Sequence, residues 1–156
     1  MKRARILVVE DGFEYSRALE RIAEDRAELV RAEDAEEAGR ALDGGAFDAV
    51  LLDVAFDRIP EERLVGDRGR GTEHLARLQG FYIADALAPR LPPYTRVVMA
   101  YDFSGDPERL EALRERLPGL EGLREGTGME ELLARLLATP SRESPLPPRA
   151  GGEGAG

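Results

Sequence analysis

The sequence has no cysteine and a single histidine, His74. Without thiols the chain cannot form disulfides, zinc–thiolate centres, iron–sulfur clusters or thiol nucleophiles, and one histidine excludes a multi-histidine metal site. No apolar run approaches the roughly 20 residues of a membrane span, and the first residues lack the apolar stretch of a signal peptide. These absences predict a cytoplasmic protein without a membrane partner.

Positive charge is also scarce, because 22 basic residues face 31 acidic ones and the net charge is -9. Lys2 is the only lysine, so arginine supplies nearly all of that positive charge. An acidic balance argues against a nucleic-acid partner held by overall charge. The 156 residues suit one domain with a tail, and a hydrophobic content of 42% is enough for a packed core.

Short β-prone runs alternate along the chain with segments of helical spacing. The β-prone runs are 4–9, 28–32, 47–53, 96–100 and 119–123, the last of them weak because it holds two glycines. The helical segments are 13–24, 34–43 with Asp34 as its cap, 72–89, 106–117 and 129–137. This alternation predicts an α/β fold, a doubly wound five-stranded parallel sheet with helices on both faces.

The domain is predicted to cover residues 1–138. Within it, residues 54–72 read as an extended loop, because Pro60 and three glycines interrupt any regular element. Residues 139–156 are rich in proline, glycine, serine and charge, and this composition predicts a disordered tail.

Three carboxylates follow the first and third predicted strands. Glu10 and Asp11 come directly after 4–9, and Asp53 ends 47–53. Ligands of parallel α/β sheets bind beyond the carboxyl ends of the strands, and three like charges there repel unless a cation lies among them. Mg²⁺ prefers such oxygen ligands, and a carboxylate on that ion could attack a phosphoryl donor. The alternative is ordinary, since acids at strand ends also cap the helices that follow them.

Four segments resemble the receiver domain of bacterial two-component response regulators, over about residues 3–138. They are Arg5–Gly12 (RILVVEDG), Asp48–Asp53 (DAVLLD), Val98–Asp102 (VMAYD) and Met129–Arg135 (MEELLAR). The resemblance implies the flavodoxin-like strand order 2-1-3-4-5. It also implies that Glu10, Asp11 and Asp53 bind Mg²⁺ and that Asp53 is the phosphoacceptor for a histidine kinase.

The sequence departs from the receiver pattern in four places. Met99 stands where the family has Thr or Ser, and a methionine cannot donate a hydrogen bond to a phosphoryl oxygen. The family's lysine after strand five is missing, and Arg124 is the nearest cation, with Glu125 an equally good alignment. Residues 119–123 contain no aromatic switch residue, and the loop after Asp53 is longer than usual by roughly fifteen residues. This pattern favours a stand-alone pseudo-receiver that keeps its metal ligands and acts by protein–protein contact.

Two other functions remain open. One is a working receiver, phosphorylated on Asp53 by a histidine kinase. The other is a small Mg²⁺-dependent phosphotransfer enzyme or nucleotide-binding domain, against which the segment after 4–9 has only one glycine, Gly12, and no glycine-rich phosphate loop.

Residues 54–79 carry arginines that suggest partner docking, namely Arg58, Arg63, Arg68 and Arg70. A solvated mobile loop explains the segment equally well, whereas anion binding through Arg68–Gly71 is weaker because five acids offset five arginines. His74 could act as a general base, but the start of an exposed helix is the simpler reading. Ser104 could replace the missing hydroxyl, but it more simply caps a loop. The leucines of 129–137 read as core, and in receivers the surface around this helix meets partners or a second copy, which allows a homodimer.

Overall fold

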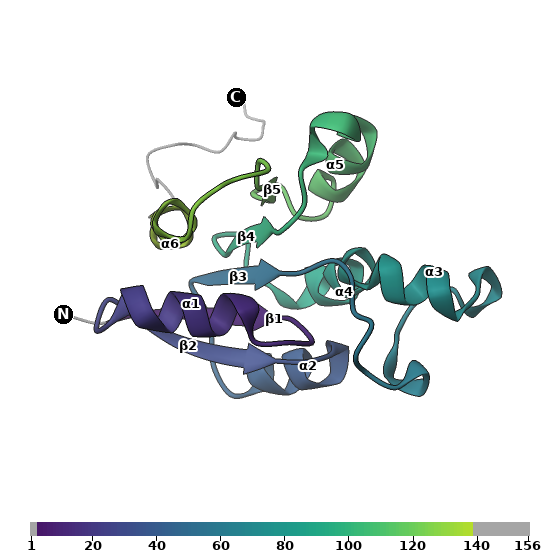
Figure 1. The fold of residues 1–156 in the computed structure, drawn as a ribbon, viewed down its shortest axis with the longest axis horizontal. Helices are drawn as coiled ribbons and strands as arrows, with labels where there is room; N and C mark the ends of the chain where they lie inside the picture. The colour runs from purple at the N-terminus through teal and green to yellow at the C-terminus, as the bar shows by residue number, and fades with distance from the viewer. Residues whose placement is uncertain (1–2, 139–156) are drawn as a thin grey trace, which may run out of the picture.

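Apolar runs of the chain form the strands of one parallel sheet (Figure 1). The computed structural model describes residues 3–138. Its strands are β1 (Ala4–Val9), β2 (Ala27–Ala32), β3 (Ala49–Leu52), β4 (Arg96–Met99) and β5 (Glu121–Gly122). Their order is β2-β1-β3-β4-β5, which confirms the predicted doubly wound sheet. The weak fifth run is indeed the shortest strand.

Residues 3–138 contain six α-helices. They are α1 (Glu14–Ala23), α2 (Ala35–Asp43), α3 (Thr72–Arg77), α4 (Gln79–Leu87), α5 (Pro107–Arg114) and α6 (Met129–Leu137). All but α3 pack against the two faces of this sheet. Because side chains alternate along a strand, Ile6 and Val8 pack with α1 and α6, whereas Leu7 and Val9 pack with α2, α4 and α5. None of the helices in the described part is long and apolar enough to span a membrane.

The predicted helix over 72–89 is interrupted at Leu78, whose φ of -116° and ψ of 21° are not helical. The interruption has a tertiary cause. In an unbroken helix the amide of Gly80 would donate to the carbonyl of Ala76. Instead the Gly80 amide donates to Val54, and the Ala76 carbonyl accepts from the amide of Phe56. The chain that follows β3 therefore inserts between α3 and α4.

The segment 54–71 is packed rather than a solvated loop. It contains two 3-10 turns, η1 (Glu61–Arg63) and η2 (Arg68–Arg70), and lies with α3 at one end of the molecule, to the right in Figure 1. Phe56 and Leu64 are almost completely buried in the core that also holds α2 and α4. Burial of these side chains fixes the segment against the sheet. The tail predicted at 139–156 lies outside the described residues.

Candidate functional site

The carboxyl ends of β1, β3 and β4 meet at one edge of the sheet. There the amide of Asp53 donates to the carbonyl of Val9 at 2.9 Å, and the amide of Ala100 donates to the carbonyl of Leu52 at 2.8 Å. Glu10 and Asp11 follow β1 directly, so the structure brings all three predicted carboxylates to the same edge. Their side chains nevertheless have different hydrogen-bond partners.

Glu10 is 1% exposed, and its carboxylate is directed at the start of α1. One oxygen accepts the amide of Tyr15 at 3.0 Å and the other accepts the amide of Ser16 at 2.8 Å. The residue before α1, Phe13, has no side chain that can cap, so Glu10 satisfies these otherwise unpaired amides. The capping alternative for an acid at a strand end is therefore realised at Glu10.

Asp11 and Asp53 each keep one oxygen without a protein hydrogen bond among the described residues. The other oxygen of Asp11 accepts the amide of Arg58 at 2.9 Å, and that of Asp53 accepts the amide of Val54 at 2.9 Å. Burial raises the pKa of Asp53 to about 6, and the charges of Asp11, Glu10 and Glu14 add to this effect against the Val54 hydrogen bond. The negative charge on Asp53 is thus disfavoured unless a positive charge approaches it.

The carboxylates at this edge of the sheet offer fewer metal ligands than the sequence predicts. In the part of the chain that the structure describes, no three His, Cys, Asp or Glu side chains are arranged to hold a metal ion. The two oxygens of Glu10 are taken by helix amides, which leaves the free oxygens of Asp11 and Asp53. Mg²⁺ commonly binds through one or two carboxylates and keeps several waters, so this pair suits it.

The end of β4 offers no hydroxyl to a phosphoryl group. Met99 pairs with Leu52 in the sheet and is completely buried in the core. The next residue, Ala100, continues the ladder beside Asp53 and lines a cavity of about 600 Å³. A methionine in the core and an alanine at the cavity both lack the donor that the receiver pattern provides at this place.

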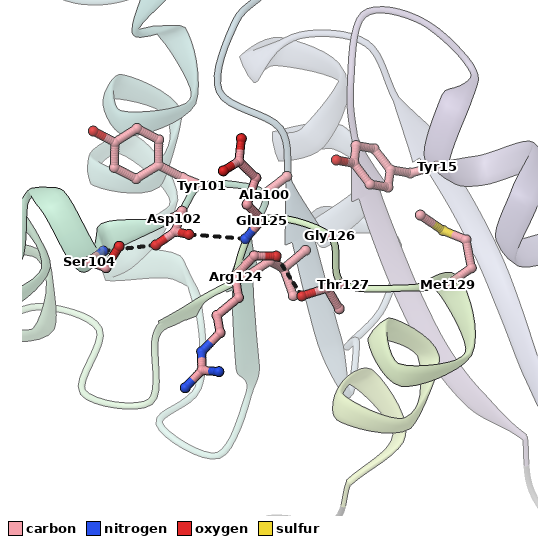
Figure 2. A pocket seen from close by; sticks show the side chains of 11 residues that line it. Tyr15, Ala100, Tyr101, Asp102, Ser104, Arg124, Glu125, Gly126, Thr127 and Met129 are labelled. Atoms are coloured by element: carbon pink, nitrogen blue, oxygen red, sulfur yellow. Dashed lines mark hydrogen bonds between the residues drawn. The ribbon is translucent and has the colours of Figure 1, made fainter.

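This cavity, drawn in Figure 2, is closed on one side by a hydrogen-bonded junction between two loops. Asp102, after β4, accepts the amide of Ser104 at 2.9 Å and the amide of Glu125 at 3.0 Å. Hydrogen bonds from Ser104 and then from Glu125 lower the pKa of Asp102 to about 2. Ser104 therefore belongs to a loop cap, which is the simpler of the two roles that the sequence allows. Asp102 connects that loop to the loop after β5.

Arg124 begins a tight turn after β5 and is exposed. Its carbonyl accepts the amide of Thr127 at 3.1 Å and the Thr127 hydroxyl at 2.6 Å. Figure 2 shows its guanidinium directed away from Ala100 and Tyr15. The cation nearest to the family's lysine position thus points away from the cavity wall that adjoins Asp53.

Two aromatic residues lie near this edge, of which the sequence pointed to Tyr101 but not to Tyr15. Tyr15 of α1 lines the cavity, and burial, then the charge of Asp53, raises its pKa. Tyr101 packs edge-on against Phe81 and Phe103, with ring centroids 5.0 and 4.7 Å away, and its hydroxyl donates to Asp106 at 3.0 Å. The aromatic residue near strand five thus comes from the loop after β4. The position of Tyr101 directly after a predicted strand is the signal that indicated this residue.

The four arginines assigned to partner docking have different surroundings. Arg63 forms ion pairs with Asp34 and, at 3.1 Å, with Glu33. The guanidinium of Arg68 donates to the carbonyls of Glu61 and Leu64 at 3.1 and 2.6 Å. The side chains of Arg63 and Arg68 hold the segment 54–71 in place through these contacts. Arg58 and Arg70 are exposed, and their guanidiniums have no hydrogen-bond or ion-pair partner among residues 3–138.

His74 is half-buried, and its Nε2 lies 2.9 Å from the hydroxyl of Tyr82. It lines a second cavity together with Arg70. No residue of the sheet edge is among the residues that line this second cavity, so His74 does not belong to the carboxylate site.

No protein-family model matches the sequence, and no curated protein matches it. Solved structures do. The receiver domain of NtrX from Brucella abortus is 23% identical with a TM-score of 0.56, over 84% of this chain and 97% of that one. The BeF3-activated receiver domain of DrrB is 19% identical with a TM-score of 0.58, over 86% and 95%. The chain has the fold of a response-regulator receiver domain.

Two further similar structures show why this similarity is restricted to the fold. Against a longer NtrX chain crystallised with ADP, the protein spans 27% of that chain's length, at 21% identity and a TM-score of 0.58. A structure described as an adenylate cyclase from Rhodopirellula baltica is 18% identical with a TM-score of 0.60, over 86% of this chain and 85% of that one. At such low sequence identities the similarity shows the receiver fold, and the activity of the other protein cannot be assigned to this chain.

Proposed function

We propose that the protein is a receiver-fold signalling module that binds Mg²⁺ through Asp11 and Asp53 and acts by contact with a protein partner. In this proposal Glu10 orders the start of α1 and contributes charge rather than a ligand. The bound cation would neutralise the repulsion among the carboxylates and would offset the raised pKa of Asp53.

The observation that carries the pseudo-receiver form of this proposal is the wall that faces Asp53 on β4 and β5. A working receiver needs a hydroxyl and a cation there to respond to the phosphoryl group, as the resemblance implies. This chain places buried Met99 and apolar Ala100 at the first position, and an outward Arg124 at the second. Attack by Asp53 would remain chemically feasible, but its structural response would not follow.

The working receiver is the second candidate, and Asp53 itself favours it. The half-buried carboxylate keeps one oxygen free of protein hydrogen bonds and lies beside Asp11. A histidine kinase would be the partner in that case, with the Asp53 oxygen accepting the phosphoryl group. Dimer formation through α6 stays a prediction.

The test is a backbone NMR titration with Mg²⁺, first alone and then with beryllofluoride, which mimics an acyl phosphate. We expect Mg²⁺ to shift the amides near Asp11 and Asp53, and Asp11→Asn or Asp53→Asn to abolish the shift. Glu20→Gln, an exposed change of equal charge on α1, is the control. We expect beryllofluoride to add no shift in α5 or α6.

Shifts that spread with beryllofluoride to β4, α5 and α6 would establish the working receiver and overturn the pseudo-receiver. Absence of any Mg²⁺ response would overturn both. Hydrolysis of a phosphate ester that is lost in Asp53→Ala would instead identify a phosphotransfer enzyme.

A further inference from the structure

The second cavity, of about 310 Å³, lies between α3, α4 and α5 and shares no lining residue with the cavity of Figure 2. Phe81 of α4 and Leu113 of α5 give it an apolar wall. Arg70 reaches it from the segment 54–71, which makes the loop after Asp53 unusually long, and His74 reaches it from α3. The cavity is therefore partly built by the insertion.

The charge of this cavity is opposite to that of the molecule. Three arginines, Arg70, Arg109 and Arg116, line it beside a single acid, Asp85, although the chain carries a net charge of -9. Arg116 pairs with Asp85 at 2.5 Å, and Arg109 pairs through Nε with Asp106 at 2.8 Å. A guanidinium has five N–H donors, so each of these arginines keeps donors for another acceptor.

Arg70 is the least engaged of the three. Its side chain is exposed, and its guanidinium has no hydrogen-bond or ion-pair partner among residues 3–138. Arg68 stabilises the segment that carries Arg70, because its guanidinium donates to the Leu64 carbonyl at 2.6 Å. The backbone at Arg70 is thus held in place, whereas its guanidinium is unpaired among residues 3–138.

Other groups in the cavity are held in place before any ligand arrives. Arg109 lies over the Phe81 ring, 4.4 Å from its centroid, while its Nε is bound to Asp106. The His74 and Tyr82 rings meet edge-on at 5.9 Å, and their polar atoms are 2.9 Å apart. Because these side chains are already ordered, the entropic cost of binding a ligand is lower.

We propose that this cavity binds a small phosphate monoester, whose phosphate is held by Arg70, Arg109 and Arg116. Its organic part packs on Leu78 and Tyr82, which line the cavity and are partly exposed. Guanidinium groups match the paired oxygens of a phosphate, and a planar pair of hydrogen bonds is the strong form of that contact. The volume is near the lower bound of about 300 Å³ for small-molecule sites, so the ligand is small. The proposal does not depend on the chemistry of Asp53.

The test is an NMR titration of the full chain with phenyl phosphate in the absence of Mg²⁺, with phenol and inorganic phosphate as comparison probes. We expect saturable shifts at the amides of His74, Tyr82 and Leu113 with phenyl phosphate, weaker ones with phosphate and none with phenol. Arg70→Gln and Arg116→Gln should each weaken phenyl phosphate binding about tenfold, the loss of one charge-assisted contact.

Arg77→Gln is the matched control, because Arg77 is exposed on α3, does not line the cavity and carries the same charge. Its binding constant should equal that of the parent protein. Equal weakening by all three substitutions, or shifts that never saturate, would mean general attraction of anions and would overturn the site. A short phosphotyrosine peptide should bind no more tightly than phenyl phosphate, and much tighter binding would overturn the small-ligand form of the proposal.

Discussion

Asp53 carries an unfavourable charge in the folded protein. Its carboxylate is half-buried, and Asp11, Glu10 and Glu14 repel its charged form. The pKa therefore rises from its ordinary 3.8 to about 6, which means that folding favours the protonated acid. Between these two values the folded protein binds a proton that the unfolded chain has lost, so the free energy of unfolding falls as the pH rises through that window.

Asp53→Asn should accordingly stabilise the metal-free protein above pH 6. We expect a gain of about 1 kcal/mol near pH 7, after allowance for solvent screening, that shrinks toward zero near pH 4. Asparagine can still accept the amide of Val54 through its side-chain oxygen. Urea unfolding of both proteins at the two pH values, in the presence of a chelator, measures the difference. A gap that is the same at both values would refute the raised pKa.

The structure also separates residues that looked alike in the sequence. Glu10 and Asp11 are adjacent acids after one strand, yet Glu10 turns inward to the amides of α1 and Asp11 turns to the amide of Arg58. Both residues follow the end of β1, where Glu10 lies against the start of α1 and Asp11 lies against the chain that follows β3. Residue type alone could not assign the cap to one and the free oxygen to the other.

At the scale of elements, α4 approaches the end of β3 so closely that only glycine fits at the contact. A Cβ on Gly80 would lie 2.0 Å from the carbonyl oxygen of Asp53 and 2.7 Å from the Cα of Val54. Both neighbours are backbone atoms, which cannot rotate away as a side chain can. The position of Asp53 is thus fixed by the packing of a helix distant in sequence.

Gly80→Ala should push α4 away from β3. We expect the free energy of unfolding to fall by about 3 kcal/mol or more, since overpacking against backbone is poorly relieved. Gly105→Ala is the control, because no atom lies within 4 Å of a Cβ placed there. Thermal or urea unfolding compares the two. Equal stability of the two variants would show that α4 has room to move.

Arg63 connects the 54–71 segment to the start of α2. It pairs with Asp34, which is 1% exposed and whose other oxygen caps α2 by accepting the Glu37 amide at 2.8 Å. Arg63→Gln should lower the free energy of unfolding, because it leaves a buried carboxylate without its charged partner. Faster proteolytic cleavage between residues 56 and 70 should accompany the loss. Arg77→Gln, exposed on α3, should change neither measurement.

At the scale of the whole molecule, the insertion is part of the core rather than an appendage. Phe56 is completely buried and packs in the cluster that contains β1, β3, α2 and α4. We therefore expect residues 54–71 to unfold together with the sheet. Their deletion would remove core as well as surface, so partner binding is better tested with single exposed side chains such as Arg58 and Arg70.

Phe56→Ala should lower the stability of the entire domain. A buried phenylalanine replaced by alanine costs about 3–5 kcal/mol, and we expect this loss in a single cooperative transition. Tyr94→Ala, at a side chain that is 54% exposed, should change the free energy of unfolding by no more than about 0.5 kcal/mol. A separate early transition in Phe56→Ala would mean that the insertion folds independently of the sheet.

Much of the fold follows from the sequence, because hydrophobic runs and helical spacing are local properties. The positions of β1, β2 and α6, the cap at Asp34 and the weakness of β5 agree with the residues that predicted them. The break at Leu78 could not be predicted, since it depends on hydrogen bonds to Val54 and Phe56, which are more than twenty residues away in the chain. The same holds for the pairing of Arg63 with the buried Asp34.

The sequence by itself determined the alternating α/β pattern, the carboxylates at the strand ends and the missing hydroxyl and lysine, since each needs only the identity of residues near one another in the chain. Only the tertiary structure decided that Glu10 caps α1, that the Arg124 guanidinium is directed away from Ala100 and that Arg70 and Arg109 line one cavity. Burial, hydrogen-bond geometry and charge at a site depend on distances between segments. Those distances exist only after the sheet and its helices have packed.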